Sequence, residues 1–67
     1  MMNPKYPHVQ VQLVGSDGNA FAIMGRTARA MRQGGVPKEE IDMFFDEATA
    51  GDYNDLLATC MRWVECS

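Results

Sequence analysis

Glycine and proline constrain the fold of this chain more than any other feature, because they divide it into short segments. The breaks fall at residues 4–7, 15–18, 34–37 and 49–51. Proline fixes its own φ and restricts the residue before it, while glycine permits the left-handed turns that end helices. Each segment between the breaks is long enough for one short element. Residues 1–67 therefore predict a single small domain built from short elements.

The N-terminal part predicts a strand. Pro4 and Pro7 keep residues 1–7 extended and non-helical. Residues 8–14 then alternate between apolar and polar side chains, which is the two-residue period of a half-buried strand. The apolar set is Val9, Val11 and Leu13, and the polar set is His8, Gln10 and Gln12. Residues 15–18, with the sequence GSDG, predict a turn after this strand.

The next segment, residues 19–33, predicts the first helix. Asn19 is a good N-cap, because its side-chain oxygen accepts a hydrogen bond from a free amide of the first turn. One stripe of side chains recurs at helical spacing and is expected to be buried: Phe21, Ile23, Met24, Thr27, Ala28, Ala30 and Met31. Gly34 and Gly35 end the helix by offering a residue for the left-handed position that follows it.

Two further helices follow. Pro37 suits the first position of the second helix, and Glu39 and Glu40 lie in its first turn, where the helix dipole favours anions. Its expected apolar face is Ile41, Phe44, Phe45 and Ala48. Asp52 is the expected N-cap of the third helix. The expected buried stripe of that helix is Tyr53, Leu56, Leu57, Cys60 and Met61.

The tail from Met61 to Cys66 is compatible with two structures. Trp63 and Val64 either continue the third helix or begin a short strand. We expect the strand, because the first strand needs a partner and a lone strand is not stable. Pairing of the first strand with its copy in another chain remains open. The sequence therefore predicts an α+β fold: an N-terminal strand, three short helices and a short C-terminal strand that pairs with the first.

A chain this short buries only about 60% of the surface that its unfolded form exposes, so each large apolar side chain matters. The expected core is Val9, Val11, Leu13, Phe21, Met24, Ala28, Met31, Ile41, Phe44, Phe45, Leu56, Leu57, Met61 and Trp63. Truncation of a buried Phe45 or Trp63 to alanine is expected to cost about 3–5 kcal/mol.

Charge is divided unequally along the chain. Residues 1–38 hold five cations and one acid (net +4), and residues 39–67 hold eight acids and one cation (net −7), which together give the net charge of −3. A small protein of this kind presents faces of opposite charge, and such an electrostatic field favours binding over catalysis.

Three arginines, Arg26, Arg29 and Arg32, recur at every third position of the first helix. In one interpretation they form a basic stripe that binds phosphate or an acidic partner. In the other they are an ordinary solvated face of the helix. Nucleic-acid binding through this helix is the alternative function. The acidic second helix would repel the phosphate backbone, so nucleic acid is not the expected partner.

The second helix supplies the other candidate interaction residues, Met43, Asp46 and Glu47. Met43 lies beside Phe44 and Phe45, so this helix carries apolar groups on more than one face. One such face suits the core and the other suits a partner. The acidic surface favours either a basic partner or simple solubility.

No set of residues indicates catalysis. His8 is the one histidine, and nothing in the pattern pairs it with Cys60 or Cys66. Two cysteines are too few for a disulfide framework, and without a second pair they do not suggest a zinc site. We expect no enzyme activity, no metal and no cofactor. No apolar run suits a membrane helix or a signal peptide, so we expect no membrane contact and a cytoplasmic protein.

Three motifs carry a resemblance that covers most of the chain. They are VQLVGSDGNAF at residues 11–21, GVPKEEID at 35–42 and GDYNDLLATCMRWV at 51–64. With these motifs, residues 13–64 resemble a set of small proteins from bacteria and their phages. The resemblance implies a stand-alone small domain and favours a phage-borne protein that binds and modulates another protein, and it gives no residue a role. We therefore expect a protein-interaction module with an unidentified protein partner, or a homodimer.

Overall fold

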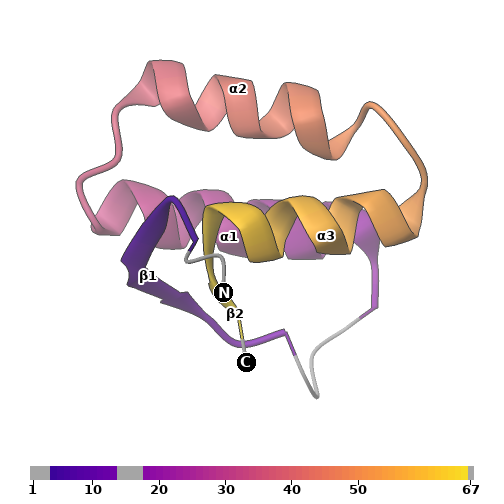
Figure 1. The fold of residues 1–67 in the computed structure, drawn as a ribbon, viewed down its shortest axis with the longest axis horizontal. Helices are drawn as coiled ribbons and strands as arrows, with labels where there is room; N and C mark the ends of the chain where they lie inside the picture. Colours follow the sequence, from indigo (N-terminus) through magenta and orange to yellow (C-terminus); the bar gives the residue numbers. More distant parts are fainter. Residues whose placement is uncertain (1–3, 14–17, 67) are drawn as a thin grey trace.

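The computed structural model describes residues 4–13 and 18–66. Its elements follow the order β1 (Tyr6–Val11), α1 (Ala20–Gln33), α2 (Lys38–Ala48), α3 (Tyr53–Trp63) and β2 (Val64–Cys66). The two strands form a parallel sheet. α1 and α3 lie between α2 and this sheet (Figure 1). This arrangement confirms the predicted α+β fold, including the C-terminal strand that pairs with the first.

The sheet joins the two ends of the chain. Tyr6 pairs with Val64 and Val11 pairs with Cys66, with an irregular register between Tyr6 and Gln10. Pro7 is in this irregular interval, where its missing N–H breaks no regular ladder bond. The strand begins two residues earlier than the predicted range of 8–14 and ends at Val11. The predicted turn at 15–18 falls largely outside the described residues.

The ends of α1 follow from its capping residues, as predicted. Asn19 Oδ1 accepts a hydrogen bond from the Phe21 amide at 2.8 Å. At the other end Gly35 has a φ of 86°, the left-handed conformation that suits glycine. Its amide donates to the Arg32 carbonyl at 3.2 Å, so one of the last free carbonyls of the helix is satisfied.

The ends of α2 and α3 show two differences from the prediction. Pro37 is the N-cap of α2 and Lys38 is the first helical residue, one position later than expected. Asp52 caps α3 as predicted, and Asp55 returns a hydrogen bond to the Asp52 amide in a capping box. Trp63 is the last residue of α3, so the strand begins at Val64 rather than at the tryptophan.

The core lies where the three helices and the sheet meet. Its buried apolar side chains are Val9, Val11, Ile23, Met24, Ala28, Met31, Val36, Ile41, Phe44, Ala48, Leu56, Cys60, Trp63 and Val64. Thr27 and Thr59 are also buried. Each threonine hydroxyl donates to the carbonyl four residues earlier, at 2.9 Å for Thr27 and 2.8 Å for Thr59. Neither hydroxyl is therefore left without a partner in the core.

The prediction that Phe21 belongs to the core is wrong, because its side chain is 80% exposed. The buried positions of α1 are centred on Ile23, Thr27 and Met31. At about 100° per residue, Phe21 lies about a third of a turn away from that centre. The helix buries its threonine and leaves its phenylalanine outside.

The prediction for Met61 is wrong for the same geometric reason. Met61 is 58% exposed and Tyr53 is 43% exposed. The buried stripe of α3 passes through Thr59 and Cys60, which places Met61 on the outer side. The remaining predicted core residues that are not fully buried are packed against its edge: Leu13, Phe45 and Leu57.

Candidate interaction surface

One side of α1 carries exposed residues that the core does not use. Phe21, Gly25, Arg29 and Arg32 are all exposed. Their spacing places the four within about 80° of arc on the helix surface, away from the buried stripe. We call these four residues the α1 face. It combines a large aromatic ring, a bare backbone position and two guanidinium groups.

No steric contact within this chain requires a glycine at position 25. A Cβ atom placed on Gly25 would meet nothing within 4 Å. By contrast, a Cβ on Gly34 would come within 2.8 Å of the Val9 side chain, so that glycine is needed for packing against β1. A glycine inside an exposed helix costs about 1 kcal/mol relative to alanine. The fold of the described residues offers no compensation for this cost at Gly25.

The three predicted arginines do not act together. Arg26 donates a hydrogen bond to the Gln12 carbonyl at 3.2 Å and so tethers the segment after β1. Arg29 and Arg32 are exposed, and within residues 4–13 and 18–66 the ion pair that forms joins Lys5 to Glu40 instead. The predicted basic stripe is therefore reduced to two guanidinium groups that are free to meet a ligand.

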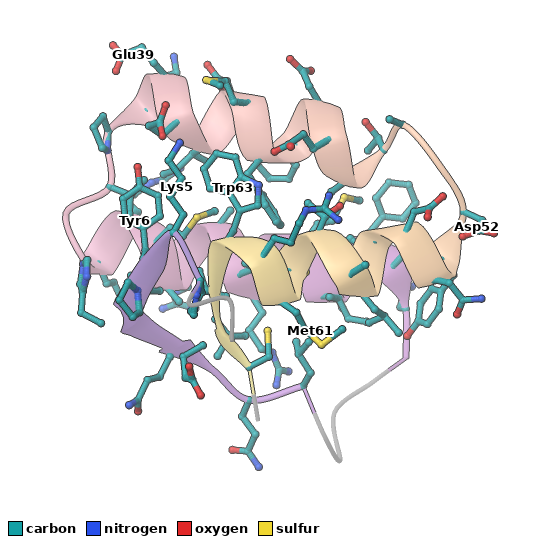
Figure 2. The ribbon with its side chains drawn as sticks, in the orientation of Figure 1. Lys5, Tyr6, Glu39, Asp52, Met61 and Trp63 are labelled. Atoms are coloured by element: carbon teal, nitrogen blue, oxygen red, sulfur yellow. The ribbon has the colours of Figure 1, made fainter. Side chains whose placement is uncertain are left out.

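A shallow hollow of about 270 Å³ opens beside Phe21, where α1 begins and α2 turns into α3. Its lining is mainly apolar: Ala20, Phe21, Met24, Ala48, Thr49, Gly51, Asp52, Tyr53 and Leu56. Asp52 supplies the one ionised group of this lining and lies at the end of the molecule opposite Glu39 (Figure 2). The hollow therefore suits an apolar stem that ends in a cation.

The structure places the three candidate residues of α2 in different surroundings. Met43 is 49% exposed and Asp46 is exposed. Glu47 instead has an internal role, because its Oε2 accepts a hydrogen bond from Trp63 Nε1 at 2.6 Å. A second hollow, of about 370 Å³, is lined by Arg32 together with the α2 residue Asp42. No described contact joins Met43 or Asp46 to the α1 face.

A polar and aromatic cluster that the sequence analysis missed connects β1 to α2 and α3. Lys5 forms an ion pair with Glu40, and Tyr6 donates a hydrogen bond to the same carboxylate at 2.8 Å. The Lys5 ammonium lies 4.5 Å from the centre of the Trp63 ring. The Tyr6 and Trp63 rings stack with centroids 6.0 Å apart (Figure 2). We call these four residues the Lys5 clip.

The ionisation of the Lys5 clip follows from these contacts. The hydrogen bond from Lys5, followed by that from Tyr6, lowers the pKa of Glu40 below its ordinary value of 4.5. The same hydrogen bond raises the pKa of Lys5 above 10.5. Loss of solvation, and then the hydrogen bond to Glu40, raises the pKa of Tyr6 above 10.0. At neutral pH the clip therefore holds a carboxylate, an ammonium and a neutral phenol.

The two cysteine thiols and His8 have different surroundings in the structure. Burial raises the pKa of Cys60. Burial, followed by the proximity of Cys60 and Glu65, raises the pKa of Cys66 to about 11. Both thiols are free and protonated at neutral pH, which makes them poor nucleophiles. His8 Nε2 lies 3.2 Å from the Gly34 carbonyl oxygen.

Within the described part of the chain, we find neither a metal-binding cluster nor a membrane-spanning helix. Within it, no group of three or more His, Cys, Asp and Glu side chains is placed to hold a metal ion. No helix among the same residues combines the length and the apolar character needed to cross a bilayer. Comparison with models of protein families, with curated proteins and with solved structures gave no match.

Proposed function

We propose that this chain is a non-enzymatic protein-interaction module that acts in the cytoplasm and binds protein through the α1 face. The observation that carries the proposal is the exposure of Phe21, 80% of whose side chain is open to solvent. A single exposed apolar side chain is common on protein surfaces, but Phe21 lines a mainly apolar hollow together with the partly exposed Tyr53, and contiguous apolar surface of this kind favours a partner.

The charges beside Phe21 support the same function. Arg29 and Arg32 lie on the arc of Phe21, and Asp52 lies in the hollow that Phe21 lines. Aromatic and arginine side chains are the residues that most often carry binding energy in protein interfaces. Opposite charges at the two ends of one surface also fix the orientation of a bound partner.

The proposal is tested by capture with matched variants. Immobilised wild-type protein and a Phe21→Ser variant are incubated with lysate of the source cells, and bound proteins are identified by mass spectrometry. Glu65→Lys, a charge reversal at an exposed β2 residue that lies outside the α1 face and lines neither hollow, serves as the control. We expect at least one protein that binds the wild type and the control and is lost with Phe21→Ser. The same protein, once purified, should bind the wild type at a fixed stoichiometry.

Two outcomes would contradict the proposal. One is capture of the same set of proteins by the wild type and by Phe21→Ser. The other is the absence of any saturable binding, either to a captured protein or to the chain itself. Because Phe21 is exposed, its replacement does not disturb the core, so loss of binding reports on the surface rather than on folding.

A further inference from the structure

The α1 face has a geometry that suits another helix. Phe21, Gly25 and Arg29 follow one another at intervals of four residues, so they form a ridge along the helix. Gly25 is in the middle of that ridge, and nothing lies within 4 Å of its missing Cβ. A bare position at the centre of a ridge allows a second helix to approach closely. Such an approach would explain why position 25 is a glycine, which no contact within the single chain does.

The two ends of the ridge differ in charge. At the N-terminal end, Phe21 and Asp52 line the same hollow. Toward the C-terminal end, Arg29 and Arg32 are exposed and make no described ion pair. The surface is therefore apolar with an acid at one end and cationic at the other. Such a surface is complementary to a copy of itself turned through 180°.

From this complementarity we propose that the occupant of the α1 face is a second copy of this chain, in a symmetric dimer whose two α1 helices pack antiparallel and cross at Gly25. This inference rests on the proposed function and names its partner. In an antiparallel pair centred on Gly25, residue 21 of one helix lies opposite residue 29 of the other. A parallel pair would place arginine against arginine, which is unfavourable.

The antiparallel pairing assigns a contact to each residue of the face. The guanidinium of Arg29 lies over the Phe21 ring of the second copy, a cation–π contact. The apolar stem of Arg32 enters the hollow beside Tyr53 of the second copy, and its guanidinium meets Asp52. A nucleic acid in this place would meet the arginines and would be repelled by Asp52, so it fits the surface less well.

The test is the mass of the protein in solution, measured by sedimentation equilibrium over a range of protein concentrations at low salt. We expect the mass to rise from 7.5 kDa toward twice that value. Arg32→Glu and Phe21→Ser should each weaken the dimer about tenfold or more. Asp52→Asn should weaken it less, and because asparagine is also a good N-cap, α3 stays capped. Glu65→Lys, the control, should leave the dimer unchanged.

Two results would overturn the inference. A mass of 7.5 kDa at every concentration would exclude the second copy as the occupant. A dimer that Arg32→Glu and Phe21→Ser leave intact would place the contact elsewhere. Neither result removes the proposed function, because a captured protein that binds the wild type and does not bind Phe21→Ser would still support it. Circular dichroism of each variant checks that the helices are retained.

Discussion

A matched pair of substitutions tests the burial on which the assignment of the α1 face depends. Phe21 and Phe44 are the same residue type in helical positions, yet one is 80% exposed and the other 0% exposed. Complete burial of an aromatic side chain removes about 200 Å² from water, worth about 5 kcal/mol at about 25 cal/mol per Å². Phe21 buries about one fifth of that area, which is worth about 1 kcal/mol. At both positions, alanine offsets about 0.5 kcal/mol of the loss through its higher helix propensity.

Phe44→Ala should therefore lower the free energy of unfolding by about 3–5 kcal/mol, and Phe21→Ala by about 0.5 kcal/mol. A domain of this size has a total stability of about 3–10 kcal/mol, so Phe44→Ala should unfold much of the protein. The assay is urea denaturation followed by circular dichroism, at low protein concentration and high salt so that self-association does not contribute. Equal losses for the two variants, or a larger loss for Phe21→Ala, would refute the burial assignment and with it the α1 face.

Three further predictions follow from individual contacts. First, the stability difference between the wild type and Glu40→Gln should be constant between about pH 5 and pH 10 and should shrink outside that range, as measured by thermal unfolding. Because folding lowers the pKa of Glu40, this carboxylate stabilises the folded state above pH 4.5, and the stabilisation is lost as the pH falls through the pKa of the folded protein. Because folding raises the pKa of Lys5, its ammonium stabilises the folded state below pH 10.5, and that stabilisation is lost as the pH rises through the pKa of the folded protein. Second, Gly25→Ala should raise the free energy of unfolding of the monomer by about 0.4–1 kcal/mol, and a loss of stability would show that the site is not open. Third, labelled duplex DNA at about 50 mM salt should show no shift with the wild type, and salt-sensitive binding that disappears with Arg29→Ala would support the nucleic-acid alternative instead.

The sequence predicted the element order well because each boundary has a local chemical cause. Asn19 and Asp52 cap their helices through hydrogen bonds that depend on neighbouring amides, and Gly35 takes the left-handed conformation that the end of α1 requires. The C-terminal strand was predicted from the need of the first strand for a partner, and the parallel pairing confirms it. The boundary at Pro37 was misplaced by one residue, because proline fits both the N-cap and the first helical position.

The core prediction was wrong at the N-terminal end of α1. The predicted stripe runs from Met24, Ala28 and Met31, which are buried, back to Phe21, which is exposed. The buried positions of α1 begin at Ile23, so the helical residues before it supply no fully buried side chain. Thr27 is tolerated in the core because its hydroxyl bonds to the Ile23 carbonyl.

The Lys5 clip and the bond between Glu47 and Trp63 were not predictable from spacing. Lys5 and Glu40 are 35 residues apart in the sequence, and only the return of the chain through α2 brings them together. Glu47 appears in the sequence as one of many surface acids, yet its carboxylate accepts the Trp63 indole hydrogen bond at 2.6 Å. A buried tryptophan near the end of a helix requires an acceptor, which was the one sequence clue to such a partner.

The most direct test of the central claim is a cysteine placed at the proposed crossing point. Within one chain, Gly25→Cys fits without a clash. A disulfide between two copies requires Cα atoms within about 7 Å, which is the close approach that the proposed crossing provides. In a Cys66→Ser background, mild oxidation of Gly25→Cys should give a covalent dimer of twice 7.5 kDa, much faster than the exposed control Met43→Cys. Equal or slower cross-linking at position 25 than at position 43 would contradict an antiparallel contact through the α1 face.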